Sequence, residues 1–187
     1  MPTLYVCFLQ NDVEIMESHW LNRMAAWLAP QSDNTPKIHV ELFFPDDIKS
    51  DDIVSGKACS IHYGGKVFVQ KKRFSRKQWS FRTLNVTKDQ YDKIYMFCQG
   101  HKGNTFNYLG YYLQPINVFG IHPYSFTYVG MTPKWFCSEI CVEALKAGGV
   151  LKSNVSPSIH PQSLFKMLEE STTVDCVRNY DKLDIRF

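Results

Sequence analysis

Hydrophobic and polar residues alternate, or gather in short apolar runs, through the first half of the chain, and both patterns are typical of β-strands. Pro45 ends the second run, residues 46–56 form a long polar hairpin connection, and Gly64 and Gly65 turn the chain after the third run. Strands joined in this way predict an antiparallel meander through the middle of the protein. The five predicted strands cover residues 4–9, 38–44, 58–63, 66–70 and 77–86.

Apolar residues three and four positions apart predict the helices. Thr87 and Gln90 have the spacing of a capping box, Gly148 and Gly149 are typical of a helix C-terminus, and Pro161 suits a first helical turn. The main predicted helices cover residues 12–28, 87–100, 137–147 and 161–170. A short helix, an irregular stretch and a last strand are predicted at residues 106–112, 116–130 and 174–177.

This succession of elements predicts an α+β fold with an antiparallel sheet packed against helices. A length of 187 residues fits one domain, and no repeat, low-complexity tract or linker divides the chain, so residues 1–187 are expected to form a single domain. Hydrophobic residues make up 44% and charged residues 21% of the chain, which excludes an intrinsically disordered protein.

Several features predict a cytoplasmic protein, located in the host cytoplasm or the virion if the chain is viral. No run of about 18 uncharged apolar residues is present, so no transmembrane segment is expected. The N-terminus lacks the basic and apolar regions of a signal peptide. The six cysteines lack the regular spacing of a disulfide framework, so most are expected to be free thiols in a reducing compartment.

The charge of the chain does not predict a nucleic-acid partner, because the net charge is only +3. One basic cluster stands next to Trp79. We interpret it as the solvated edge of a strand, protected by charge against edge-to-edge pairing. The alternative is weak contact with anionic surfaces. The cluster consists of Lys71, Lys72, Arg73, Arg76 and Lys77.

Cys137 is the strongest candidate for chemistry because it opens a predicted helix directly after Trp135 and Phe136. The unpaired N–H groups and the dipole of a helix N-terminus favour a thiolate, and the same N–H groups can stabilise an oxyanion. Cys141 lies one turn further into the helix and lacks this setting. From the residues alone, Cys137 is equally consistent with a small apolar residue packed at the start of a helix.

His39 lies within an apolar strand, where an imidazole serves either as a hydrogen-bonded structural residue or as a general base. Together, the histidine strand (residues 38–42) and the later Cys137 helix resemble the circularly permuted NlpC/P60 group of papain-like thiol enzymes. That group includes bacterial peptidoglycan-type amidases, poxvirus-like members and lecithin retinol acyltransferase-like lipid enzymes. The resemblance implies a circularly permuted papain-like fold, with Cys137 as nucleophile and His39 as base.

The same resemblance implies a third, orienting group on the strand that follows the histidine strand. If Phe44 pairs with Lys57, His39 lies opposite His62, which is therefore the expected third member of the triad. Two alternatives stay open. Glu41 shares the strand face of His39, and Ser60 would serve if the hairpin register shifted by two residues.

These residues imply a cysteine peptidase or amidase that forms an acyl-enzyme on a peptide, amide or ester substrate. One alternative is a lipid acyltransferase or phospholipase of the same fold, although Phe136-Cys137-Ser138-Glu139 differs from the Asn-Cys-Glu motif of the lipid-acting members. Another is a catalytically idle binding or virion module. No cofactor is expected, and no metal, because the cysteine and histidine spacings match no zinc pattern.

Overall fold

The computed structural model describes residues 1–10, 36–46, 53–75, 78–108, 133–170 and 177–179. These residues form six strands and three helices, which confirms the predicted α+β class. The strands are β1 (Thr3–Gln10), β2 (Lys37–Pro45), β3 (Ile53–Ser60), β4 (Phe68–Ser75), β5 (Trp79–Asn85) and β6 (Val177–Asn179). The helices are α3 (Lys88–Gly100), α5 (Cys137–Ala147) and α6 (Pro161–Glu170).

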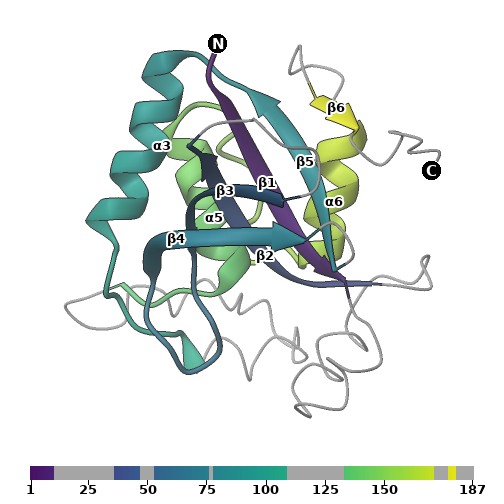
Figure 1. The fold of residues 1–187 in the computed structure, drawn as a ribbon. Coiled ribbons are helices and arrows are strands. Elements are labelled where there is room, and N and C mark those ends of the chain that lie inside the picture. Colours follow the sequence, from purple (N-terminus) through teal and green to yellow (C-terminus); the bar gives the residue numbers. More distant parts are fainter. Residues whose placement is uncertain (11–35, 47–52, 76–77, 109–132, 171–176, 180–187) are drawn as a thin grey trace.

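The six strands form one antiparallel sheet with the order β4-β3-β2-β1-β5-β6 (Figure 1). The predicted meander is correct for β2, β3 and β4, but wrong for β5, which pairs with β1 and not with β4. β1 buries Leu4 and Val6 on one face and Tyr5 and Cys7 on the other. A strand that is apolar on both faces belongs in the middle of a sheet, so β1 takes neighbours on both sides.

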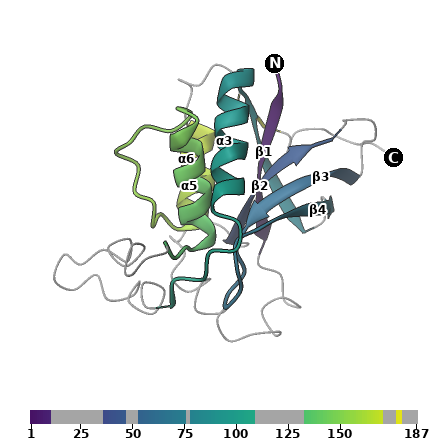
Figure 2. The same cartoon turned by 90° about the vertical axis from the view of Figure 1, so that its left-hand side faces the viewer.

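The three helices cover one face of the sheet, as the turned view shows (Figure 2). Alternate strand residues such as Val6, Val40 and Leu42 belong to the main hydrophobic core, together with Ile94 of α3 and Ile140 of α5. Because apolar burial contributes about 25 cal/mol for each Å² removed from water, this layer is the main source of stability. It also holds the N-terminus of α5 against the sheet.

The other face of the sheet encloses a second, smaller core because the sheet curls. The rings of Phe74 on β4 and Phe81 on β5 have centroids 6.2 Å apart, although β3, β2 and β1 lie between these two strands. β4 also runs across the direction of β1 in Figure 1. We call the enclosed space the curl interior; its buried residues are Tyr5, Cys7, Phe43, Ala58, Phe74 and Phe81.

Two strands differ from their predicted bounds. β3 begins at Ile53, inside the segment expected to be a connection, and ends at Ser60, before His62. β4 begins at Phe68 and continues to Ser75, well beyond residue 70. The backbones of β3 and β4 pair along this whole length. The pattern of polar and apolar side chains indicates which residues are buried. The backbone hydrogen bonds of an edge strand need no buried side chains, so the hydrophobic pattern gave the wrong bounds for β3 and β4.

The predicted helix boundaries are closer to the structure. α5 and α6 have the predicted bounds, and α3 begins after its N-cap Thr87, which forms the expected capping box with Gln90. After α5, Gly149 has φ of 68°, a conformation that glycine adopts without strain. The last strand begins at Val177, where the tail strand was expected to end. The predictions for residues 12–28, 109–112, 116–130 and 174–176 lie outside the described residues.

None of the helices in the described ranges is both long and apolar enough to span a membrane.

Candidate active site

His39 and Cys137 meet where the beginning of β2 approaches the first residue of α5. The Cys137 thiol lies close enough to the His39 ring to affect its ionisation. Burial lowers the pKa of His39, but Cys137 and Glu41 together raise it to about 9. The imidazole is therefore protonated at neutral pH, and it places a positive charge beside the sulfur atom.

Local packing explains the position of Cys137. The extended residue Phe136 precedes the helix, and its ring packs against Phe106 at a centroid distance of 5.8 Å. The Phe136 N–H donates to the buried carboxylate of Glu139 at 2.9 Å, which fixes the first turn of α5. The N–H groups of Cys137 and Ser138 have no acceptor within the helix, so they are available to an oxyanion.

Exposure separates Cys137 from the other cysteines. Of the five cysteines that the structure describes, Cys137 is the one that is not fully buried. Cys141 is buried, its thiol donates to the Val40 carbonyl at 3.7 Å, and burial raises its pKa well above the usual value. This difference agrees with the expectation that Cys141 lacks the setting of a nucleophile.

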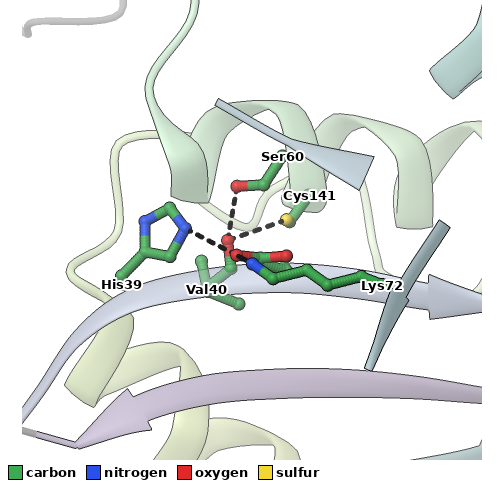
Figure 3. A network of polar contacts seen from close by, with 6 residues as sticks. His39, Val40, Ser60, Lys72 and Cys141 are labelled. Atoms are coloured by element: carbon green, nitrogen blue, oxygen red, sulfur yellow. Dashed lines mark hydrogen bonds and ion pairs between the residues drawn. The ribbon is translucent and has the colours of Figure 1, made fainter. Parts of the chain in front are cut away.

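The end of the β2–β3 ladder explains why the His39 ring is accessible to α5. The paired residues of these strands run from Pro45–Gly56 to Leu42–Cys59 and stop there. Beyond this point, the Val40 carbonyl accepts hydrogen bonds from side chains instead, as Figure 3 shows, with Ser60 Oγ at 2.6 Å. The backbone of β2 is therefore no longer paired with β3 at His39.

Glu41 is the hydrogen-bonded partner of the His39 ring. Its Oε1 lies 3.2 Å from His39 Nε2, and its side chain is completely buried (Figure 3). The pKa of Glu41 lies below its usual value, since His39 and Lys72 outweigh the effect of burial, which raises it. An ionised carboxylate therefore holds Nε2 and leaves Nδ1 as the ring nitrogen that can face the thiol.

The expected register of β2 and β3 is confirmed, since Phe44 pairs with Lys57. It brings His62 next to His39, but among the described residues these rings share no hydrogen bond: they stack, with centroids 5.1 Å apart and planes 24° apart. β3 has already ended at Ser60, so His62 lies in a turn and flat against its neighbour. Burial and the charge of His39 lower the pKa of His62 to about 4, which keeps it neutral.

The hydrogen bond to the His39 ring that was expected of His62 is thus made by Glu41, an alternative that the sequence left open. Glu41 makes the orienting contact, while the hydroxyl of Ser60 is taken up by the Val40 carbonyl. Alternation along β2 places His39 and Glu41 on one face, and this was the signal that could have found the pair.

Lys72 is the site residue that sequence reasoning missed. The interpretation of the basic cluster as a solvated edge fits Lys71 and Arg73, which are exposed on β4. Lys72 instead turns inward, and its Nζ lies 2.5 Å from Glu41 Oε1. Lys72 and the buried Phe74 are two residues apart and therefore share one face of β4, and this alternation in the sequence could have indicated that Lys72 points inward. Arg76 and Lys77 lie outside the described residues.

Ligand atoms of His39, Glu41 and His62 lie within 4.8 Å of one another, so a metal ion has to be considered. Two observations argue against it. The Lys72 ammonium already supplies a positive charge to Glu41, and stacked rings do not direct their nitrogen lone pairs to a common point. The arrangement fits a hydrogen-bonded relay better than a metal site.

No protein-family model, no curated protein and no solved structure matches this chain. The chemistry of the site therefore has to be argued from its own geometry.

Proposed function

We propose that this protein is a cysteine hydrolase that cleaves amide bonds in peptides or peptide-like substrates. In this proposal Cys137 is the nucleophile, His39 the general base and acid, and Glu41 the residue that orients His39. The observation that carries the proposal is that the His39 ring interacts electrostatically with the Cys137 thiol and contacts the buried Glu41 carboxylate at 3.2 Å. A histidine with a purely structural role would not require a partly exposed thiol at a helix N-terminus on one side and a buried carboxylate on the other.

The proposed reaction has two steps. The Cys137 thiolate attacks the substrate carbonyl carbon, and the N–H groups at the start of α5 stabilise the resulting oxyanion. The C–N bond then breaks, and His39 gives its proton to the leaving amine, which leaves a thioester on Cys137. His39 next removes a proton from water, the hydroxide attacks the thioester, and the carboxylic acid leaves as the thiol is restored.

The order of elements supports a circularly permuted papain-like (NlpC/P60) fold for this enzyme. The histidine strand β2 precedes the cysteine helix α5, and the helix packs on the antiparallel sheet that carries the histidine. We further propose a reducing compartment, the cytoplasm or a virion within it, because the five described cysteines are free. Two further points remain predictions: that the protein has no obligate nucleic-acid partner, and that Lys71 and Arg73 make weak contact with anionic surfaces.

The first test is the rate at which iodoacetamide labels each cysteine as a function of pH, measured by intact mass and peptide mapping. Below about pH 7, Cys137 should react at least tenfold faster than the buried Cys141. His39→Ala should slow the labelling of Cys137 about tenfold or more, whereas Cys141→Ala should leave it unchanged. If Cys137 reacts no faster than the other cysteines, the enzyme proposal fails and the binding module is the better reading.

A second measurement separates hydrolysis of amides from action on lipids. A fluorogenic peptide-amide library and phospholipid vesicles are incubated with the wild-type chain, and Cys137→Ser serves as the blank. Turnover of peptides without vesicles supports the proposal. Turnover that requires vesicles would overturn it in favour of the lipid acyltransferase or phospholipase.

A further inference from the structure

Lys72 crosses the curl interior to reach the site. It lies on the edge strand β4, whereas Glu41 lies on β2, and β3 stands between the two strands. The Lys72 side chain is 24% exposed and its Nζ contacts the fully buried Glu41 carboxylate. Lys72 Nζ and His39 Nε2 contact the same carboxylate oxygen, Glu41 Oε1. Figure 3 shows the Lys72 side chain extended towards His39.

Three aromatic rings hold the Lys72 ammonium in this position. Its Nζ lies 5.7 Å from the centroid of Phe68, 5.1 Å from that of Phe74 and 5.0 Å from that of Trp79. An ammonium group prefers the negative faces of such rings to an apolar surrounding, most strongly when it is partly removed from water. The neighbouring Lys71 and Arg73 are exposed on the same strand, so the burial of Lys72 does not follow from its place at the edge.

The ammonium adds to the positive charge of His39, because the other groups around Glu41 do not favour its charge. Cys7 faces Glu41 from β1, Cys141 approaches from α5, and both are buried thiols. His62 beyond His39 is neutral. Among the described residues, the positive charges near the carboxylate are therefore those of His39 and Lys72.

We propose that Lys72 is a positioning residue for the catalytic pair, which keeps the buried Glu41 ionised and in contact with His39 under mildly acidic conditions. Glu41 touches the imidazole and lies beyond it from the sulfur, so its charge favours the ion pair of thiolate and imidazolium over the neutral pair. Lys72 thus extends the acidic range in which Cys137 is reactive. This inference rests on the proposed function.

The test compares Lys72→Met with Lys71→Met, a matched change at the neighbouring exposed position. Iodoacetamide labelling of Cys137 is measured in the full chain at about pH 5 and about pH 8, and the ratio of the two rates is taken. In Lys72→Met the ratio should fall about threefold, because a rise of about one unit in the pKa of Glu41, which starts below its usual value, would protonate much of the carboxylate at pH 5. Lys71→Met should keep the wild-type ratio, and Lys72→Arg should retain most of it.

A variant pair separates this role from simple loss of packing. In a Glu41→Gln background no carboxylate is left to stabilise, so adding Lys72→Met should change the ratio no further. The double variant is also the safer background for folding, because it leaves neither the Glu41 carboxylate nor the Lys72 ammonium buried without its partner. An unchanged ratio in Lys72→Met, or a further fall in the double variant, would overturn the inference.

The two proposals fail in different ways. If wild-type Cys137 is no more reactive than the other cysteines, the proposed function fails. If wild-type Cys137 is highly reactive and Lys72→Met behaves as Lys71→Met does, only the role of Lys72 is rejected.

Discussion

The charge state of His39 decides how the site depends on pH. Its pKa of about 9 lies above the ordinary value of 6.5, so the imidazolium in the folded protein persists through neutral pH. A raised pKa contributes stability that is fully present below about pH 6.5 and is lost as the pH rises through about 9. The proposed thiolate–imidazolium pair should disappear over the same upper range, which gives hydrolysis an alkaline limit.

Glu41→Gln should move this alkaline limit to lower pH. The amide removes the negative charge and the charge-assisted hydrogen bond, both of which raise the pKa of His39. Titration of the His39 ring by NMR should show a pKa lower by about one unit or more. The rate of hydrolysis should fall tenfold or more at about pH 8. An unchanged His39 titration would remove Glu41 from the triad.

His62→Phe tests the assignment of the third residue from the other side. A phenyl ring can replace the stacked imidazole on His39 and Phe68, but it cannot donate or accept a hydrogen bond. We therefore expect labelling of Cys137 to change less than about threefold. His62→Ala is the control for the loss of stacking. A loss as large as that of Glu41→Gln would return the orienting role to His62.

At the scale of elements, the position of Cys137 depends on how α5 packs against α3. Gly148 ends α5 beside Ile94, and a Cβ built there would lie 2.4 Å from Ile94 Cγ1 and 3.1 Å from the Gln90 carbonyl oxygen. The backbone of Gly148 is right-handed, so glycine is required here for close approach of the two helices and not for its φ.

Gly148→Ala should therefore destabilise the protein by about 1–3 kcal/mol through overpacking. The matched control is Gly100→Ala at the end of α3, where no atom lies within 4 Å of an added Cβ. Helix propensity predicts that this control is neutral or stabilising by up to about 1 kcal/mol. Urea unfolding of both variants measures the difference, and equal stabilities would contradict the close approach.

At the scale of the whole molecule, the curl of the sheet joins the two cores and the site. Phe74 is 1% exposed although its strand is at the sheet edge, and its ring packs against Phe43, Trp79 and Phe81. These contacts bring β4 round to face β5. They also carry Lys72, two residues away, to the buried carboxylate of Glu41.

Phe74→Ala should cost about 3–5 kcal/mol of unfolding free energy, because the ring lies in a core that few neighbouring side chains can refill. If enough folded protein remains, the labelling ratio of Cys137 between about pH 5 and pH 8 should also fall, since Lys72 loses its support. Phe74→Leu is the conservative control and should lose about 1 kcal/mol. If Phe74→Ala loses no more stability than Phe74→Leu, the curl of the sheet does not depend on this ring.

The amino-acid sequence by itself determined the local elements and two members of the site. The apolar spacing in residues 137–147 and 161–170 is strong enough to define α5 and α6 at the predicted bounds, because periodicity and capping act within one element. The same local reasoning singled out Cys137 at a helix N-terminus and His39 on a strand, the resemblance to NlpC/P60 enzymes assigned their roles, and the structure brings the two side chains near each other.

Only the tertiary structure decided how distant segments meet. β1 lies between β2 and β5 in the sheet. The alternation of residues along β5 would suit a place beside β4 equally well, so the sequence pattern alone does not choose its neighbour. The choice between Glu41 and His62 depends on where β3 ends, because a ring beyond the ladder lies flat against His39 instead of donating to it. Lys72 reaches Glu41 only because the sheet curls, and curl is a property of the whole sheet that no single strand encodes.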